Sequence, residues 1–425
     1  MPGLSINKTK GLGMDKHYVI FAKFENFSRI VNEGLSSLRY EKTLITNNQR
    51  LIERCSDHYH HFLCVEDLTS PQVVEFILTL HDEKPVNGIF SESEDLVQFT
   101  ALLRERLGLT CGVIGRDGDF FRDKVKMKNH LAQEKVILIP EYRTVHHFAD
   151  AIDFLSKHAP EAIIKPIDGA GSLHTFRVHL DNIHEYEQLL NDHAGKFEIE
   201  QYIDGKMFHM DSVVYNNQVA FTSVACYTHS TLECREGKPL CGYFYPDHEM
   251  PLVQQLIAAN NKVLSAMPIT SGVAHTELLV TKQQEILFCE TAARIAGGGI
   301  IFGIEDTCGV NPLLEGARAF VGEQPLFNQY YPQTNGGYLL LYKKKGRVKH
   351  VTPSSDFLQI QGVKRADILP QVGDCLSFSG SSGDVAGVVT WSVDSFEENE
   401  RIRNEIEHLW ELEMEVSLFD EEGEA

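Results

Sequence analysis

Two glutamates in strand-like surroundings place the strongest constraint on how this chain folds. Glu277 and Glu290 stand in the segments 274–280 and 285–292, which are mostly apolar and separated by a short polar stretch. If these segments pair as a hairpin with its turn at residues 283–284, the two glutamates become direct partners on one face. Like charges about 5 Å apart destabilise a sheet, and glutamate has a low strand propensity. We therefore expect a cation between the two carboxylates.

The surrounding residue types indicate which cation this hairpin would bind. Hard oxygen ligands without a histidine and cysteine cluster favour Mg²⁺ or Mn²⁺. In the same register His275 faces Ala292, and Arg294 projects just beyond the metal ligands. The alternative is an exposed hairpin whose outward glutamates bind nothing.

Size and charge exclude several classes of protein. A chain of 425 residues with 43% hydrophobic content is expected to form about two to four structural units. A net charge of −21 repels nucleic acid and anionic lipid, so we expect neither partner. Nine cysteines without a CxxC spacing favour a reduced, cytoplasmic protein. No apolar run reaches the roughly 20 residues of a membrane helix. Residues 1–13 lack a signal-peptide pattern and are predicted to be a disordered extension, with Met14 as a candidate start.

Strand and helix patterns alternate through the first hundred residues. Such alternation is typical of a parallel α/β layer, Rossmann-like in outline, whose ligand edge would lie near residues 91–95. No GxGxxG is present, so no dinucleotide site is predicted. The expected strands are 17–24, 42–47 and 86–95, and the expected helices are 28–38, 71–83 and 96–109.

The pattern changes at about residue 118 to an α+β unit with mostly antiparallel pairing. A helix over 123–136 has Asp123 as its candidate N-cap. A hairpin is expected around Asn216 and Asn217. Further strands are expected at 161–167, 174–180 and 197–203, with helices at 148–158 and 183–193. Short strands and one final helix fill the last hundred residues.

A lysine and a glycine-rich loop form a candidate phosphate site. Lys165 ends an apolar strand, and the loop that follows contains Gly169, Ala170, Gly171 and Ser172. Small residues let backbone N–H groups approach anionic oxygens closely, and the lysine adds a point charge. The next element reads as a strand, so this is not a Walker loop. A plain tight turn is the alternative.

Two further segments carry candidate ligand-binding residues. Lys124 stands at a helix start rich in basic residues and could contact a second phosphate, although a solvated basic face is the alternative. The segment 197–205 ends a strand with Glu200, Tyr202 and Ile203. Its carboxylate and backbone groups suit the edge of a purine and a ribose; a polar strand residue without a ligand is the alternative.

Taken in order, these elements resemble the ATP-grasp superfamily over roughly residues 120–300. Within it, "GVAHTELLVT" and "ETAARIAGGG" look most like the L-amino acid ligases, including the dipeptide-forming enzymes of bacilli. Many members carry an asparagine metal ligand where this chain has Ala292, an alanine that the dipeptide ligases share. Related hinges often have an acid where this chain has Met207, so His209 or Asp211 would have to replace it at the ribose.

The resemblance implies a fold and a division of the chain. The fold would be ATP-grasp, α/β and α+β, with a Rossmann-like N-terminal domain at 14–117. The ATP-grasp domain would span 118–325 with a lid at about 141–205, and a β-rich C-terminal subdomain would span 326–425. By analogy alone, the enzyme could form a homodimer.

The resemblance also implies a reaction. ATP would phosphorylate the carboxylate of one amino acid, and the amine of a second would attack the acyl phosphate, leaving ADP and phosphate. Mg²⁺, or Mn²⁺, would sit on Glu277 and Glu290, and Arg294 would stabilise the acyl phosphate. His275 would either orient the substrate or be a satisfied structural histidine. The predicted ATP contacts are Lys124, Lys165, Gly169, Gly171, Ser172, Glu200, Tyr202, Ile203 and His209.

Substrate contacts are expected from three places. Glu92, in the loop after a first-unit strand, could contact a substrate ammonium, as could Glu94; Gly298 and Gly299 would let the backbone approach the substrate. The aromatic-rich segment 233–250 predicts an apolar donor such as Met or Leu with a small acceptor. The alternatives are another ATP-grasp carboxylate–amine ligase with a non-dipeptide substrate, and a non-catalytic ATP-binding regulator.

Overall fold

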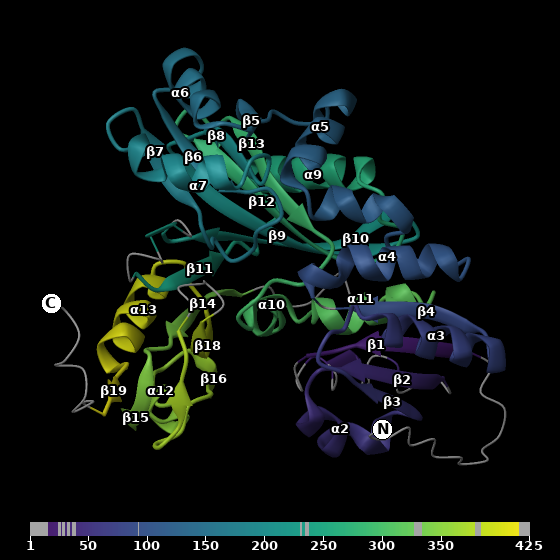
Figure 1. Cartoon of the computed structure of the whole chain (residues 1–425). Coiled ribbons are helices and arrows are strands. Elements are labelled where there is room, and N and C mark those ends of the chain that lie inside the picture. Colours follow the sequence, from purple (N-terminus) through teal and green to yellow (C-terminus); the bar gives the residue numbers. More distant parts are fainter. Residues whose placement is uncertain are drawn as a thin grey trace, which may run out of the picture.

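The computed structural model describes most of the chain (Figure 1). The described residues are 16–23, 27, 30–31, 35, 40–91, 93–229, 232–233, 238–326, 334–378 and 384–415. The predicted extension 1–13, most of the predicted helix 28–38 and the candidate substrate residue Glu92 lie outside them. The eight described cysteines are free thiols. Within the described part of the chain, no helix has both the length and the apolar character that a membrane crossing requires.

The first sheet is four-stranded and parallel throughout, as the alternating pattern predicts. In spatial order it contains β3 (His61–Cys64), β2 (Glu41–Thr46), β1 (His17–Phe21) and β4 (Val86–Ser91). The short strand β3 was not predicted. One face packs against α3 (Pro71–Glu83) and α4 (Val97–Arg106). The other packs against α2 (Gln49–Cys55) and against α11 (Pro312–Phe320), which comes from much later in the chain.

The largest sheet has eight strands and is antiparallel throughout. Its spatial order is β13 (Ile286–Ala292), β12 (Gly272–Thr281), β9 (Gly205–Tyr215), β10 (Gln218–Tyr227), β11 (Leu240–Phe244), β14 (Asn335–Tyr342), β18 (Val385–Val393) and β16 (Val363–Ile368). The predicted hairpin joins β9 to β10, with Asn216 and Asn217 at φ 50° and 61°. Both residues have the positive φ that a type I′ turn needs.

Helices and two small sheets complete the molecule around the large sheet (Figure 1). The helices are α5 (Lys124–Glu134), α6 (Phe148–Lys157), α7 (Glu187–Asp192), α9 (Pro251–Ala266), α10 (Ile300–Cys308), α12 (Ser354–Phe357) and α13 (Glu398–Leu409). Short 3₁₀ turns cover Ser56–His58, Glu94–Leu96, Gly115–Phe121 and Ile183–Tyr186. The first small sheet contains β5 (Tyr142–Val145), β8 (Phe197–Gln201), β6 (Glu161–Pro166) and β7 (Phe176–His179). The second contains β17 (Cys375–Leu376), β15 (Gly346–Val351) and β19 (Leu412–Met414).

The hydrophobic cores fix the helices to the sheets. α6 and α7 pack on the first small sheet through Phe154, Leu155 and Leu190. α5 and α9 pack on the large sheet through Met127, Leu131 and Leu256. Figure 1 shows the first small sheet at the top of the molecule, above β12 and β9. The glycine-rich loop between β6 and β7 and the end of β8 therefore face the hairpin that carries the paired glutamates.

Candidate active site

The two predicted metal ligands are direct partners in the β12–β13 ladder. Glu277 pairs with Glu290 and His275 pairs with Ala292, as the sequence predicts. The ladder then shifts by one residue, so Leu278 pairs with Phe288 and Cys289 stands as the extra residue of a bulge. The predicted register is therefore right at the glutamates and wrong toward the turn, because the bulge takes up one residue.

The paired glutamates line a cavity of about 850 Å³ between the first small sheet and the large sheet. This volume lies within the range of small-molecule sites. The predicted site residues in its wall come from four segments of the chain. The predicted site residues that line it are Lys124, Lys165, Gly169, Gly171, Ser172, Glu200, Tyr202, Ile203, Glu277 and Glu290.

Lys124 connects the start of α5 to two walls of this cavity. Asp123 caps the helix, accepting hydrogen bonds from the backbone N–H of Val125 and Lys126 at 3.0 Å each. Its neighbour Lys124 donates from Nζ to the Gly169 carbonyl at 2.7 Å and lies 3.3 Å from Glu290 Oε2. The lysine thus stands between the glycine-rich loop and a predicted metal ligand.

Charges around the glutamates keep Glu290 ionised. Burial favours its neutral form, but Lys124, Lys165 and Arg294 outweigh burial and lower the pKa of Glu290 to about 2. Glu277 accepts a hydrogen bond at Oε1 from the Tyr227 hydroxyl at 3.0 Å. Two facing carboxylates in a cavity with basic walls form an oxygen-only donor set that suits Mg²⁺ or Mn²⁺. The residues present therefore fit the predicted metal.

His275 belongs to a buried chain of hydrogen bonds behind Glu277. Asp211 bonds His275 Nδ1 at 2.9 Å and His209 Nδ1 at 2.8 Å. Burial disfavours the charged imidazole, but Asp211 outweighs burial and raises the pKa of His275 to about 9. His275 Nε2 then lies 3.6 Å from Glu277 Oε1. The ring is placed to hold the carboxylate in position, in line with the structural alternative for this histidine.

His209 does not reach the cavity, contrary to the predicted ribose contact. Its side chain is fully buried, with Nδ1 bonded to Asp211 and Nε2 bonded to the Tyr338 hydroxyl at 2.9 Å. The ligand atoms of His209, Asp211 and His275 lie close enough together to hold a metal ion. Each carboxylate oxygen of Asp211 already bonds one histidine, so the three side chains form a buried hydrogen-bonded unit.

Arg294 is held by an acid from the first unit. Glu94, which follows β4, accepts from Arg294 Nε at 2.7 Å and from an Arg122 terminal nitrogen at 2.7 Å. Arg294 also donates to the Ile295 carbonyl at 2.7 Å. Glu94 is thus engaged by two guanidinium groups and is not free for a substrate ammonium in this state.

The local backbone conformation and packing explain why Gly298 and Gly299 are glycines. Their φ angles are +67° and +88°, in the left-handed region that favours glycine. A Cβ on Gly298 would lie 2.5 Å from Leu340, and one on Gly299 would lie 2.9 Å from Val388. Backbone conformation and packing account for both glycines, and their predicted contact with substrate remains a prediction.

The aromatic residues of segment 233–250 pack into the protein core. The described members are Tyr243, Phe244 and Tyr245, and none of them lines the large cavity. Tyr243 donates to Glu400 at 3.0 Å, and Tyr245 packs against Phe208. The apolar donor expected from these aromatics therefore gains no support from this cavity and stays a prediction.

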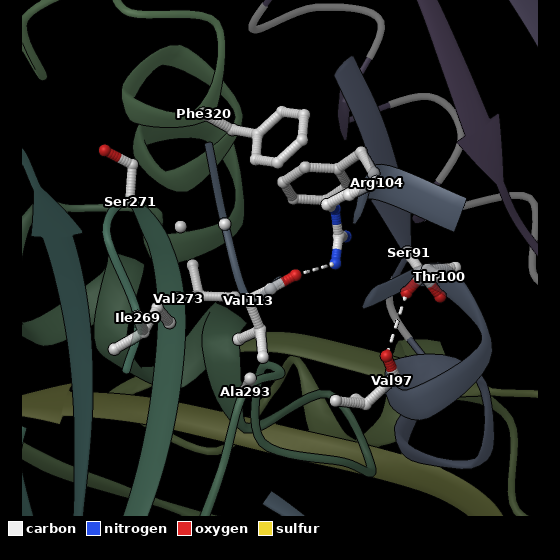
Figure 2. Close-up of a pocket in the computed structure, with 13 residues that line it drawn as sticks. Ser91, Val97, Thr100, Arg104, Val113, Ile269, Ser271, Val273, Ala293 and Phe320 are labelled. Atoms are coloured by element: carbon white, nitrogen blue, oxygen red, sulfur yellow. Dashed lines mark hydrogen bonds between the residues drawn. The ribbon is translucent and has the colours of Figure 1, made fainter. Parts of the chain in front are cut away.

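A second, small cavity lies between the first unit and the large sheet (Figure 2). Its volume is about 30 Å³, which holds a water molecule but not an amino acid. Buried Arg104 closes one wall by donating to the carbonyls of Ile89 and Val113, and its guanidinium lies near the Phe320 ring. This small cavity lies where the first unit packs against the large sheet.

Sequence reasoning missed three residues that contact the predicted ligands. The Tyr227 hydroxyl donates to Glu277. Lys128 donates to Glu198, and Lys165 donates to Glu200, within one buried cluster. A signal for Lys128 was present, because it stands four residues after Lys124 on the same helix face. Tyr227 had no such signal, since it lies 50 residues from its partner.

Comparison with known proteins supports the fold. No family model matches the chain. The L-amino acid ligase from Bacillus licheniformis matches with a TM-score of 0.76 at 21% identity, over 95% of this chain and 100% of that one. The biotin carboxylase domain dimer of the Hydrogenobacter thermophilus 2-oxoglutarate carboxylase, solved with MgADP, ADP and bicarbonate, matches with a TM-score of 0.71 at 14% identity, over 95% and 91%. The chain has the ATP-grasp fold that the sequence predicts.

A curated relative supports the narrower resemblance. The L-arginine-specific L-amino acid ligase of Bacillus subtilis is 26% identical over 362 residues, covering 83% of this chain and 84% of that one. The resemblance to L-amino acid ligases that the hairpin motifs indicate is confirmed.

Proposed function

We propose that this chain is an ATP-dependent ligase that joins two L-amino acids into a dipeptide. The observation that carries the proposal is the pairing of Glu277 with Glu290 in a cavity that also holds Lys124, Lys165 and the glycine-rich loop. Phosphoryl transfer needs this combination, because the protein contributes mainly positioning and charge neutralisation. The overall reaction would consume ATP and release ADP and phosphate.

A role is proposed for each of these residues. Mg²⁺ or Mn²⁺, when bound by Glu277 and Glu290, would neutralise charge on the transferring phosphoryl group. Lys124 and Lys165 would hold phosphate oxygens, and Gly169, Gly171 and Ser172 would cover them and exclude water. Arg294, oriented by Glu94, would stabilise the acyl phosphate and the oxyanion that forms when the amine attacks.

The rest of the cavity wall would bind the nucleoside. Glu200, Tyr202 and Ile203 line the same cavity, at and after the end of β8. Arg177 lies 3.8 Å from the Tyr202 ring centroid and adds a cationic group at this wall. These residues would contact the base. For the substrate ammonium, Glu92 stays a candidate.

The amino-acid pair is the part of the proposal that experiment must decide. An apolar Met-like or Leu-like donor with a small acceptor is the pair proposed from the sequence. L-Arginine joins it as a test donor because the curated relative is L-arginine-specific. We also propose a cytoplasmic protein, with a homodimer as the assembly to test by sedimentation.

The decisive experiment is a product survey. Purified protein with ATP, Mg²⁺ and pooled L-amino acids should release phosphate, and mass spectrometry should detect dipeptides that are missing without ATP. ADP as the nucleotide product supports an acyl phosphate, whereas AMP would indicate adenylation. If no amino acid raises phosphate release above background, the dipeptide assignment is wrong. Release with another carboxylate and amine would then favour a different ATP-grasp ligase, and binding of ATP without turnover would favour a regulator.

A further inference from the structure

Four buried charged side chains meet behind the nucleotide wall of the cavity. Lys128 and Glu198 are both 0% exposed and lie 2.8 Å apart, Nζ to Oε1. Lys128 also donates to Glu200. Lys165 lies 2.6 Å from Glu200 Oε1 and 3.6 Å from Glu198 Oε1. Two lysines and two glutamates thus form one neutral cluster.

The four members differ in their access to the cavity. Lys165 and Glu200 line it, whereas Lys128 and Glu198 do not. Lys128 comes from α5, one turn after Lys124, and its Nζ lies 5.1 Å from the Tyr142 ring centroid. The second oxygen of Glu198, Oε2, is buried and has no hydrogen-bond partner among the described residues. Lys128 therefore supplies much of the positive charge that Glu198 needs.

This arrangement places a constraint on Lys165. To bind a phosphate oxygen, its ammonium group must give up part of its contact with Glu200. Burial favours a neutral Glu200, but Lys128 and Lys165 outweigh burial and lower its pKa to about 2. If Lys165 turns toward a phosphate, Lys128 is the positive charge that still faces the glutamates.

We propose that Lys128 is a positioning residue that frees Lys165 to bind the nucleotide. Its positive charge balances Glu198 and Glu200 from the side away from the cavity, so that Lys165 can bind the phosphate oxygens. Without Lys128, two buried carboxylates would share one lysine, and their attraction would hold Lys165 against the protein. The inference rests on the proposed function, because it requires that the cavity binds ATP.

The test measures ADP binding by calorimetry, with and without Mg²⁺, together with the melting temperature. Lys128→Met is expected to weaken ADP binding at least about tenfold and to lower the melting temperature. Lys126→Met is the matched control, because Lys126 lies on the same helix, is half exposed, and its ammonium group pairs with Asp119 and not with the buried cluster. It should bind ADP as the unaltered protein does.

Two further variants separate positioning from general stability. Glu198→Gln should bind ADP at least as tightly as the unaltered protein, because it weakens the hold on Lys165. Lys128→Met with Glu198→Gln should recover most of the affinity, because one charge of each sign has been removed. A merely structural role would instead lower affinity in all three variants.

The outcomes also distinguish this inference from the proposed function. If the unaltered protein binds neither ADP nor ATP, the proposed function fails. If it binds them, and Lys128→Met binds ADP equally well or the double variant binds no better than Lys128→Met, the positioning role is wrong. Should Lys128→Met not fold, the direction of the change in Glu198→Gln decides, since weaker binding there contradicts the proposal.

Discussion

Glu277 and Glu290 face each other across the β12–β13 ladder, although Cys289 interrupts that ladder directly beside them. On the side of Glu277 away from the turn, the two strands pair without a shift, with His275 opposite Ala292. The bulge places the irregularity between the site and the turn, so the turn can vary without separating the carboxylates. Bulges are over-represented next to active sites, where they re-aim a side chain or end the pairing.

Neutralising either glutamate should remove the metal requirement together with the activity. Glu277→Gln and Glu290→Gln keep the side-chain volume but remove one carboxylate charge each. We expect ATP-dependent phosphate release to fall at least about 100-fold, and Mg²⁺ to lose its effect on ADP affinity. Glu285→Gln, at the exposed turn of the same hairpin, is the control. Retained Mg²⁺ dependence in both site variants would contradict the metal assignment.

The contact between Glu94 and Arg294 should affect chemistry more than nucleotide binding. Glu94→Gln removes the charge that orients two arginines, so kcat is expected to fall about tenfold while ADP affinity stays within about twofold. Steady-state kinetics with both amino acids varied provide the measurement, and Asp95→Asn serves as the neighbouring control. A rise in amino-acid KM with kcat unchanged would show instead that Glu94 binds the substrate ammonium directly.

The cap of α5 should connect stability to nucleotide binding. Asp123→Ala removes two hydrogen bonds at the helix start and should cost about 1 kcal/mol of unfolding free energy. Because Lys124 is the first residue of this helix, ADP affinity should fall as well. Urea unfolding and calorimetry measure the two effects, and Asp123→Asn, which keeps a capping oxygen, should reverse most of both. Unchanged stability in Asp123→Ala would show that the cap contributes little.

His17 should make the protein less stable in mild acid. Burial lowers the pKa of His17 from 6.5 to about 4, outweighing the Glu41 carboxylate, which raises it, and His61 adds to the lowering. The unfolded chain therefore binds this proton at higher pH than the folded chain does. The stabilising contribution of neutral His17 is complete above pH 6.5 and is lost as the pH falls toward 4. The loss is on the order of 3 kcal/mol of unfolding free energy.

Urea unfolding of His17→Gln across this pH range checks the expectation. The variant should lose less stability between pH 7 and pH 4 than the unaltered protein. The control His58→Gln changes an exposed histidine of the first unit and should behave like the unaltered protein. Equal pH dependence in all three proteins would rule out His17 as a source of the acid sensitivity.

Several features could be read from neighbouring residues alone. α3 spans the predicted Pro71–Glu83, Asp123 caps α5, and Asn216 and Asn217 form the predicted turn. Each of these depends on side-chain periodicity, a local hydrogen bond or a φ preference, and all are properties of short segments. The pairing of Glu277 with Glu290 belongs to this group too, because a hairpin brings together residues that are close in sequence.

Other features depend on packing between distant segments. β14, β18 and β16 extend the large sheet, and α11 covers a face of the first sheet. Long-range packing also places Tyr227 against Glu277 and turns His209 toward Tyr338. The direction of a side chain in a multilayered protein depends on which layers meet, and this follows from burial summed over the whole chain. Short-range sequence patterns identify the side chains that are able to perform chemistry. The packing of the layers determines which of these side chains line the same cavity.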